Sequence, residues 1–236
     1  MPNPMIRKLI HSTACTLLFL TLPTLAADNQ LTAEEQAQGW QLLFNGTDMS
    51  QWRNYQQPTL NSGWQIEEGA MKLATQGAGD IVSKASYQDF ELKLDWKIAL
   101  GGNSGIFIGV DETGYKIYSH APEIQILDNE RHPDNKLESH RSGSLYDMIA
   151  SPKSSHKAAG EWNQVQISLK QGHLRVIQNG VLTADIQMGS ADWQQKVAAS
   201  KFRDWAGFGV NSKGQIGLQD HGDVVWFKNI KIKELK

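Results

Sequence analysis

The stretch FELKLDWKI, residues 90–98, alternates apolar and polar side chains without a break. Phe90, Leu92, Leu94 and Trp96 fall on one face of an extended chain, and charged side chains fall on the other. A period of two over this length predicts a β-strand with one buried and one solvated face.

Similar strand-like segments recur roughly every ten to fifteen residues on both sides of this stretch. They cover residues 63–74, 104–110, 123–128, 162–186, 215–222 and 224–235. Within the fourth segment, Asn179 and Gly180 suit a two-residue type I′ hairpin turn. With no linker or internal repeat, this spacing predicts an all-β fold, an antiparallel β-sandwich.

Two short helices interrupt the strand pattern. Thr32 and Glu35 form a capping-box pair, and Gly39 suits a helix stop. Residues 189–202 form the second candidate, with Ser190 as its N-cap and Lys201 near its end.

The first 26 residues have the pattern of a secretory signal peptide. Arg7 and Lys8 precede a short apolar run that closes at Ala26, so we expect cleavage there and a single domain over residues 27–236. The run is too short for a comfortable membrane span, and we expect no transmembrane segment after cleavage. The mature protein is expected in the periplasm or outside the cell. Removal of the segment also removes Cys15, so the mature chain needs no disulfide.

Composition restricts the classes of partner. The chain has 236 residues, 40% hydrophobic and 20% charged, which is enough for a substantial core. Without the first 26 residues it carries 21 basic and 25 acidic residues, a formal charge of −4. No basic run remains, so nucleic acid and anionic membranes are poor candidates as partners.

Three of the predicted strands have one apolar face and one mixed face. In EIQILD, residues 123–128, the isoleucines share a face and Glu123 and Gln125 point the other way. The segments 103–110 and 215–222 repeat this arrangement. Their mixed faces carry Asn103, Gly105, Phe107, Gly109, Gly217, Gln219 and His221. If these strands are neighbours, the mixed faces form a shallow polar trough in which glycines let a ligand approach the backbone.

Each of these residues also has a simpler interpretation. Glu123 alone is typical of a solvated strand carboxylate, and His221 of a turn residue. The tryptophans are mainly expected in the core, although Trp205 and Tyr146 lie in loop-like sequence that suits stacking on a sugar ring. Asp128, His132 and Asp134 could form a metal cluster, but their spacing is not that of a known site, so we expect no metal and no cofactor.

Several motifs, in order along the chain, resemble one known family. They are LLFNGTDMSQW, GNSGIFIGV, EIQILDNERHPD, GSLYDM, GEWNQVQISLKQGHLRVIQNG, AASKF and IGLQDHGDVVWFKNIKIKEL. Together they resemble the 3-keto-disaccharide hydrolase domain family over residues 39–235. The resemblance implies a concanavalin A-like jelly-roll sandwich of two antiparallel sheets, with the ligand on the concave sheet. It also implies cleavage of glycosides whose sugar is oxidised at C3.

Such cleavage has a direct chemical route. A C3 ketone acidifies the C2 hydrogen, so a base can form an enolate that expels the C1 substituent, and water then adds. This route needs a base, an acid and an oxyanion stabiliser. We assign Glu123 as base and His221 as acid or proton shuttle. The other residues predicted to contact the oxidised saccharide are Asn103, Phe107, Gln125, Asp128, His132, Tyr146, Lys201, Trp205, Gln219 and Asp220.

One position departs from the family pattern. Many relatives carry an arginine shortly after the SGIF segment, where this chain has Val110 and Asp111. If that arginine stabilises the ketone or enolate, another donor must do so here.

The main alternative function is a non-catalytic carbohydrate-binding module, and a third is a domain that binds a partner or polymer at the cell envelope. The aglycone, the linkage and the oligomeric state are left open.

Overall fold

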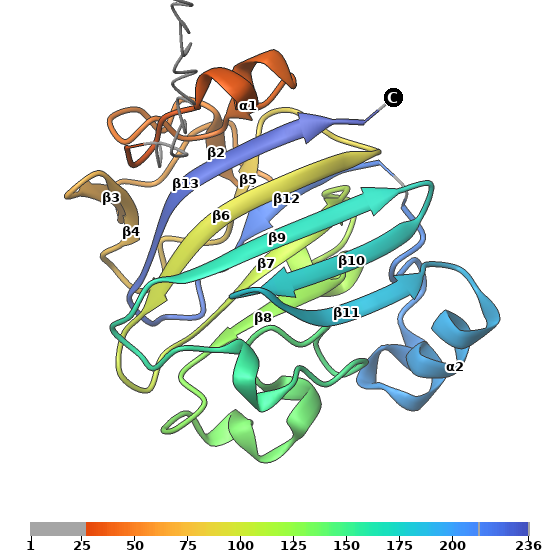
Figure 1. The fold of residues 1–236 in the computed structure, drawn as a ribbon. Coiled ribbons are helices and arrows are strands. Elements are labelled where there is room, and N and C mark those ends of the chain that lie inside the picture. The colour runs from red at the N-terminus through yellow and green to blue at the C-terminus, as the bar shows by residue number, and fades with distance from the viewer. Residues whose placement is uncertain (1–26, 212, 236) are drawn as a thin grey trace, which may run out of the picture.

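The computed structural model describes residues 27–211 and 213–235 as two β-sheets packed face to face (Figure 1). The predicted signal peptide, residues 1–26, lies outside the described residues. Among the described helices, none is both long and apolar enough to cross a membrane.

The larger sheet is entirely antiparallel. Its strands are β1 (Gln41–Leu42), β3 (Trp64–Glu67), β4 (Ala70–Leu73), β6 (Phe90–Ile98), β9 (Asn163–Lys170), β10 (His173–Gln178), β11 (Val181–Gln187) and β13 (Val225–Glu234). Their order is β11-β10-β9-β6-β13-β4-β3, and β1 pairs with β13.

The smaller sheet carries the predicted trough. Its strands are β2 (Trp52–Asn54), β5 (Ile81–Ser83), β7 (Asn103–Val110), β8 (Glu123–Leu127) and β12 (Gln215–Leu218). Their order is β2-β5-β12-β7-β8, and every pair is antiparallel. The two sheets confirm the predicted all-β sandwich.

The strand patterns explain the core between the sheets. In β6, buried and half-buried residues alternate along all nine positions, as its sequence predicts. From the smaller sheet, Ile106, Ile124 and Leu218 enter the same apolar core. The hairpin between β10 and β11 turns at Asn179 (φ 50°) and Gly180 (φ 80°), which are the two positive φ angles of a type I′ turn.

Both predicted helices are present. Helix α1 (Ala33–Ala37) begins with the complete Thr32–Glu35 capping box. In α2 (Ala191–Ala199), Ser190 accepts a hydrogen bond from the backbone N–H of Trp193. This helix ends two residues before Lys201, which instead begins the 3₁₀ turn η5 (Lys201–Asp204). Four further 3₁₀ turns lie in loops: η1 (Ile117–Ser119), η2 (Pro133–Lys136), η3 (Glu138–His140) and η4 (Lys153–Ser155).

The segment 111–122 covers part of the outer face of the smaller sheet. Ile117 and Ala121 from this segment form a second apolar cluster with Val82, Phe107 and Val110. The rest of that outer face carries the polar side chains predicted from the sequence. We call this remaining part the trough.

Candidate active site

Glu123 is the acid at the centre of the trough. Its neighbours Ile124 and Ile126 enter the core, so alternation directs Glu123 to the opposite face. The carboxylate lies over Gly105 on β7, where a Cβ atom would overlap it. This close approach explains why glycine is needed at that position. The carboxyl side chain is therefore held against the sheet.

Glu123 is buried because the edge of its strand is covered. Tyr146 donates its backbone N–H to the carbonyl of Glu123 at 2.9 Å, and Gln125 donates its own to Ser144 at 3.0 Å. The segment 143–149 thereby closes the open side of β8. Only 8% of Glu123 remains exposed, which excludes the interpretation of a solvated strand residue.

Burial dominates the acidity of this group. It raises the pKa of Glu123 to about 8, since a charged carboxylate loses its hydration there. The ammonium of Lys201 opposes this effect, while the carboxylates of Asp80 and Asp134 add to it. A carboxyl group that titrates near neutral pH can hold or release a proton during a reaction, as general acid–base catalysis requires.

Three side-chain amides around Glu123 present buried oxygen atoms without donors. They are Oδ1 of Asn103, Oε1 of Gln125 and Oε1 of Gln219, and none finds a partner among the residues that the structure describes. The strand register places Gln219, Gly105 and Gln125 side by side across β12, β7 and β8. Buried acceptors are normally satisfied, so these three indicate a ligand rich in hydroxyl groups.

A network of charged and aromatic side chains forms one end of the trough. His140 has its Nδ1 atom 2.8 Å from Asp134 and its Nε2 atom 2.9 Å from Asp147. Its ring stacks on Tyr146 at 4.3 Å, and Tyr146 donates its hydroxyl to Asp134 at 3.0 Å. Burial and Asp134 raise the pKa of Tyr146, so its phenol stays protonated.

The same network positions Lys201. Its backbone N–H donates to Asp147 at 2.7 Å, and its Nζ atom lies 4.1 Å from the centre of the Tyr146 ring. Lys201 and His140 thus both contact the Tyr146 ring. The Tyr146 ring therefore packs within the network, and its stacking on a sugar stays a prediction.

His132, His221 and Asp223 lie together at the rim of the trough, and we call them the rim cluster. One ligand atom from each falls within 4.8 Å of the others. The backbone N–H of Asn103 donates to Asp223 at 3.0 Å, which ties the cluster to β7. No hydrogen bond or ion pair joins Glu123 and His221 within the described ranges, so the two predicted catalytic groups are not a directly bonded pair.

The rim cluster is the one group of metal-ligand type found in the described part of the chain. The predicted set of Asp128, His132 and Asp134 does not come together. In addition, the backbone N–H of Asp134 donates to Nδ1 of His132 at 3.2 Å, which places the proton of a neutral ring on Nε2. A metal at Nε2 would require this hydrogen bond to change.

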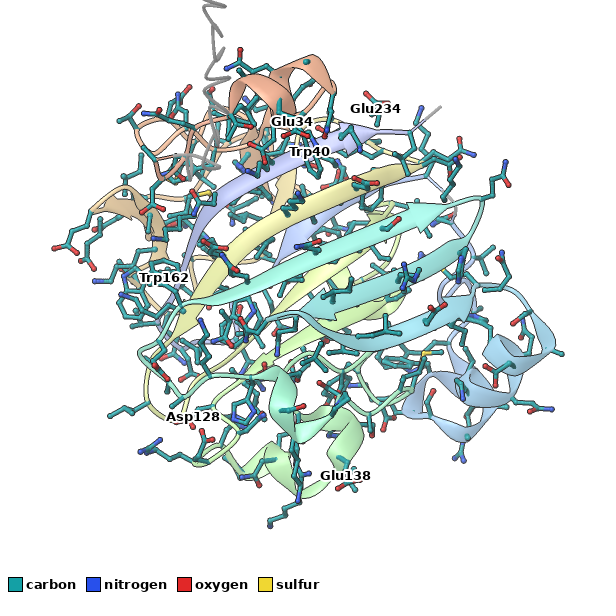
Figure 2. The ribbon with its side chains drawn as sticks, in the orientation of Figure 1. Glu34, Trp40, Asp128, Glu138, Trp162 and Glu234 are labelled. Atoms are coloured by element: carbon teal, nitrogen blue, oxygen red, sulfur yellow. The ribbon has the colours of Figure 1, made fainter. Side chains whose placement is uncertain are left out.

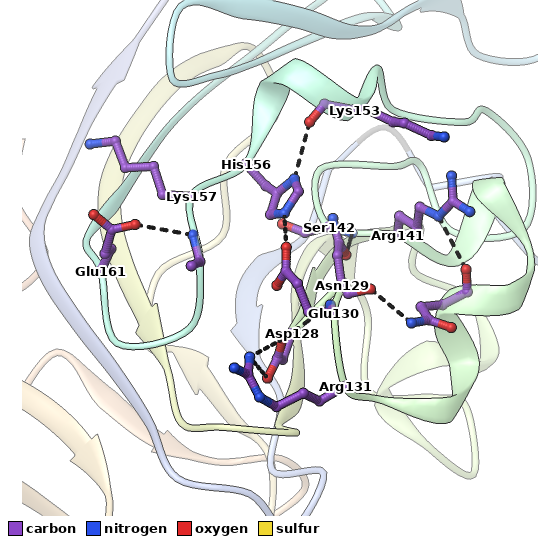
Figure 3. A network of polar contacts seen from close by, with 12 residues as sticks. Asp128, Asn129, Glu130, Arg131, Arg141, Ser142, Lys153, His156, Lys157 and Glu161 are labelled. Carbon is purple, nitrogen blue, oxygen red and sulfur yellow. Dashed lines mark hydrogen bonds and ion pairs between the residues drawn. The ribbon is translucent and has the colours of Figure 1, made fainter.

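Asp128 and Asp220 have structural partners. Asp128 is buried at the end of β8, where it accepts from the backbone N–H of Gly101 (Figure 2). It also accepts from the backbone N–H of Glu130 and contacts Arg131 (Figure 3). Asp220 accepts from Gly79 at 2.7 Å. Their carboxylates hold loops in place, so the expectation of substrate contact is not supported at these two positions.

One aromatic prediction also needs correction. Phe107 lies on the expected face, but the segment 111–122 covers it and leaves 0% exposed, so it shapes the floor without offering a free ring. Trp205 is partly buried and packs against Phe202 at 5.1 Å and Tyr118 at 5.9 Å, and its contact with the substrate stays a prediction. At the departure from the family pattern, Val110 is buried and Asp111 pairs with His120.

Sequence reasoning missed four polar residues of the site. His140 and Asp147 come from the loops that follow β8, Asp80 directly precedes β5, and Asp223 lies in the loop between β12 and β13. The position of Asp80 next to a strand that carries the trough was a usable signal. His140 and Asp147 gave no such signal, because their neighbours depend on how the loops fold.

These features define the class of protein: an antiparallel β-sandwich in which one sheet carries a buried acid with a raised pKa and three acceptors that are unpartnered among the described residues. A family model described as the 3-keto-alpha-glucoside-1,2-lyase-like domain matches residues 39–233. The chain belongs to this family, which confirms the resemblance found in the sequence.

Individual relatives agree with this assignment. A 3-keto-disaccharide hydrolase of Bacteroides thetaiotaomicron is 36% identical over 230 residues, covering 84% of this chain and 79% of that protein. A crystal structure of a candidate glycosyl hydrolase from Parabacteroides distasonis has a TM-score of 0.83 at 33% identity, covering 89% of this chain and 100% of the other. A carbohydrate-binding module of Bacillus subtilis, at 15% identity and a TM-score of 0.50, shares the fold alone.

Proposed function

We propose that the protein is an exported enzyme that cleaves 3-keto-glycosides by elimination followed by hydration. The curated relative from Bacteroides thetaiotaomicron acts, by its name, on 3-keto-disaccharides. The observation that carries the proposal is the position of Glu123, a buried acid with a pKa near 8 beside three unpartnered acceptors. A binding module would need the acceptors but has no use for the acid.

The reaction begins when ionised Glu123 takes the proton from C2 of the oxidised sugar. The electron pair of the C2–H bond forms the C2=C3 double bond of an enolate. The negative charge moves to the former ketone oxygen at C3. Collapse of the enolate re-forms the C3 ketone, forms a C1=C2 double bond and breaks the bond from C1 to the leaving oxygen. The leaving oxygen gains a proton delivered by His221, which yields the free aglycone, and the water that adds next restores the proton to His221.

Hydration completes the cycle. Water adds its oxygen to C1 of the enone, and a proton returns to C2. The net change is one glycoside and one water converted to a 3-keto sugar and an alcohol. Glu123, protonated in the first step, is the group placed to return the proton at C2, so its pKa near 8 suits both directions of transfer.

Other residues of the trough have complementary roles. Lys201 carries the positive charge that acts on Glu123. We assign it to stabilise the negative charge that develops on the ketone oxygen. His221, with half of its side chain exposed and Asp223 at 3.9 Å, is assigned to proton exchange between the trough and solvent. Asn103, Gln125 and Gln219 would accept hydrogen bonds from sugar hydroxyls.

Isotope incorporation tests this route. A 3-keto-glucoside is cleaved in D₂O, and the product is analysed for deuterium at C2 by NMR before background exchange becomes significant. Deuterium at C2 is expected, because the proton that Glu123 takes can exchange with solvent through His221 before a proton returns to C2. Cleavage of a C2-deuterated substrate without a primary kinetic isotope effect, together with no deuterium at C2 of the product formed in D₂O, would exclude elimination. The matched control is the 3-keto sugar product itself, incubated in D₂O without enzyme.

Export is a separate part of the proposal. The basic residues Arg7 and Lys8, followed by an apolar run that ends at Ala26, support a cleaved signal peptide. Intact-mass measurement of the protein from the periplasm or medium is expected to give a chain that begins at Ala27. A full-length chain confined to the cytoplasm would contradict this part alone.

A further inference from the structure

A second cavity adjoins the trough at the β5 side of the smaller sheet. Its volume is about 510 Å³, which falls within the usual range for small-ligand sites. The residues that matter to its chemistry are Tyr55, Gln56, Asn61, Asp80, Tyr115 and Lys116. They combine amides, phenol rings, one acid and one ammonium group, a composition suited to a sugar.

Asp80 links this cavity to Glu123. Ile81 pairs with Leu218, and Leu218 pairs with Ile106, so the next row across the strands consists of Asp80, Gln219 and Gly105. The carboxylate of Glu123 lies over Gly105, two strand spacings from Asp80, or roughly 10 Å. One sugar ring can therefore lie between the two acids, and whatever is attached to it extends past Asp80 into the cavity.

The carboxylate of Asp80 has one oxygen free to bind a ligand. Its Oδ1 atom accepts from the backbone N–H of Asp220 at 2.9 Å, whereas Oδ2 makes no hydrogen bond with another residue in the described ranges. Burial raises the pKa of Asp80 to about 6, and its charge contributes to the raised pKa of Glu123. Asp80 therefore lies close enough to Glu123 for its charge to act on that carboxyl group.

Hydrogen bonds fix the segments that form the far wall of the cavity. Tyr55 donates its hydroxyl to the carbonyl of Gly114 at 2.6 Å, and Gln56 donates its side-chain amide to Glu112 and Gly114 at 3.0 and 2.9 Å. These bonds hold the 112–116 turn against the loop after β2. The turn presents the ring of Tyr115, which is 86% exposed although it is a large apolar surface.

We propose that this cavity binds the leaving sugar of a 3-keto-disaccharide, with Tyr115 as its stacking surface and Asp80 as its hydroxyl acceptor. The inference rests on the proposed function, which places the oxidised ring over Glu123. It makes Tyr115 and Asp80 determinants of preference for a second sugar over a small aglycone.

Another cavity, of about 430 Å³, lies under α2 and offers a direct comparison. Its lining includes apolar side chains of Leu169, Met188, Trp193 and Phe208, which suit a sugar less well. Val210 lines it and is 74% exposed, so it provides a control position with an exposed apolar side chain, as at Tyr115.

The test compares two substrates, a 3-keto-disaccharide and methyl 3-keto-glucoside, in the wild type, Tyr115→Ala and Val210→Ala. For Tyr115→Ala we expect kcat/KM to fall about tenfold with the disaccharide, mainly through KM, and at most about twofold with the methyl glycoside. Val210→Ala should change neither. Equal losses on both substrates, no loss, or a selective loss in Val210→Ala would overturn the subsite.

Binding separates this inference from the proposed function. In a Glu123→Gln background, which keeps the substrates intact, Tyr115→Ala should weaken disaccharide binding about tenfold by calorimetry and spare the methyl glycoside. If Tyr115→Ala weakens binding of the disaccharide alone, but the wild type cleaves neither substrate, the subsite is supported and the proposed chemistry is refuted. Cleavage of both substrates without this selectivity would refute the subsite and leave the chemistry standing.

Discussion

Replacement of Glu123 by glutamine should change how protein stability depends on pH. The folded protein holds the Glu123 proton up to a pKa of about 8, whereas the carboxyl of an unfolded chain releases it near its ordinary value of 4.5. Between these values the folded state binds more protons than the unfolded state, so the free energy of unfolding falls as pH rises. Glutamine is a neutral isostere and removes this contribution.

The size of the effect follows from the two pKa values. Between pH 6 and pH 9, the ionisation of Glu123 should lower the free energy of unfolding by roughly 2 to 3 kcal/mol. For a domain of this length, that corresponds to a Tm lower by roughly 5 to 10 °C. Because the Lys201 ammonium stabilises the ionised form of Glu123, this loss of stability is smaller than burial alone would cause.

The assay is thermal melting of the wild type and Glu123→Gln across this pH range. Glu123→Gln should be the more stable of the two at pH 9, and the difference should shrink toward pH 6. Glu138→Gln is the matched control, because the side chain of Glu138 is 68% exposed at the surface (Figure 2). Parallel pH profiles for the wild type and Glu123→Gln would refute the argument that Glu123 titrates in a buried position.

Three further changes test the parts around Glu123. Gly105→Ala would force a Cβ atom into the Glu123 carboxylate and should lower kcat at least about tenfold, measured on a 3-keto-glucoside; an unchanged kcat would show that the carboxylate moves freely. Tyr146→Phe removes the hydrogen bond to Asp134 and should cost about 1 kcal/mol in urea unfolding, while unaltered stability would mean that this bond contributes nothing. A chelator should leave Tm and activity unchanged; activity lost with chelator and restored by a divalent metal would reassign the rim cluster to metal binding.

The fold could be predicted from the sequence because the patterns that indicate its strands, turns and helices are local. The alternation in residues 90–98, the Asn179–Gly180 turn and the caps at Thr32 and Ser190 each depend on a few adjacent residues. The same alternation placed Asn103, Glu123, Gln125 and Gln219 on one outer face, since side-chain direction in a strand is fixed by its period.

The rest of the site depends on contacts that join distant parts of the chain. Glu123 is buried because the segment 143–149 pairs with the edge of its strand, which no local pattern predicts. Phe107 was placed on the correct face but is covered by the segment 111–122. His140 is joined to Asp134 and Asp147 by the course of two loops, and loop geometry is the least predictable part of a sandwich.

The most direct test of the central claim is turnover of a 3-keto-glucoside with a chromogenic aglycone by the wild type and by Glu123→Gln, beside the unoxidised parent glucoside. The wild type should cleave the oxidised substrate and leave the parent intact, because the parent has no acidic hydrogen at C2. Glu123→Gln should lose roughly 10²- to 10⁴-fold in kcat, the usual contribution of a general base. Full activity of Glu123→Gln, or equal cleavage of the parent by the wild type, would contradict base-initiated elimination at Glu123.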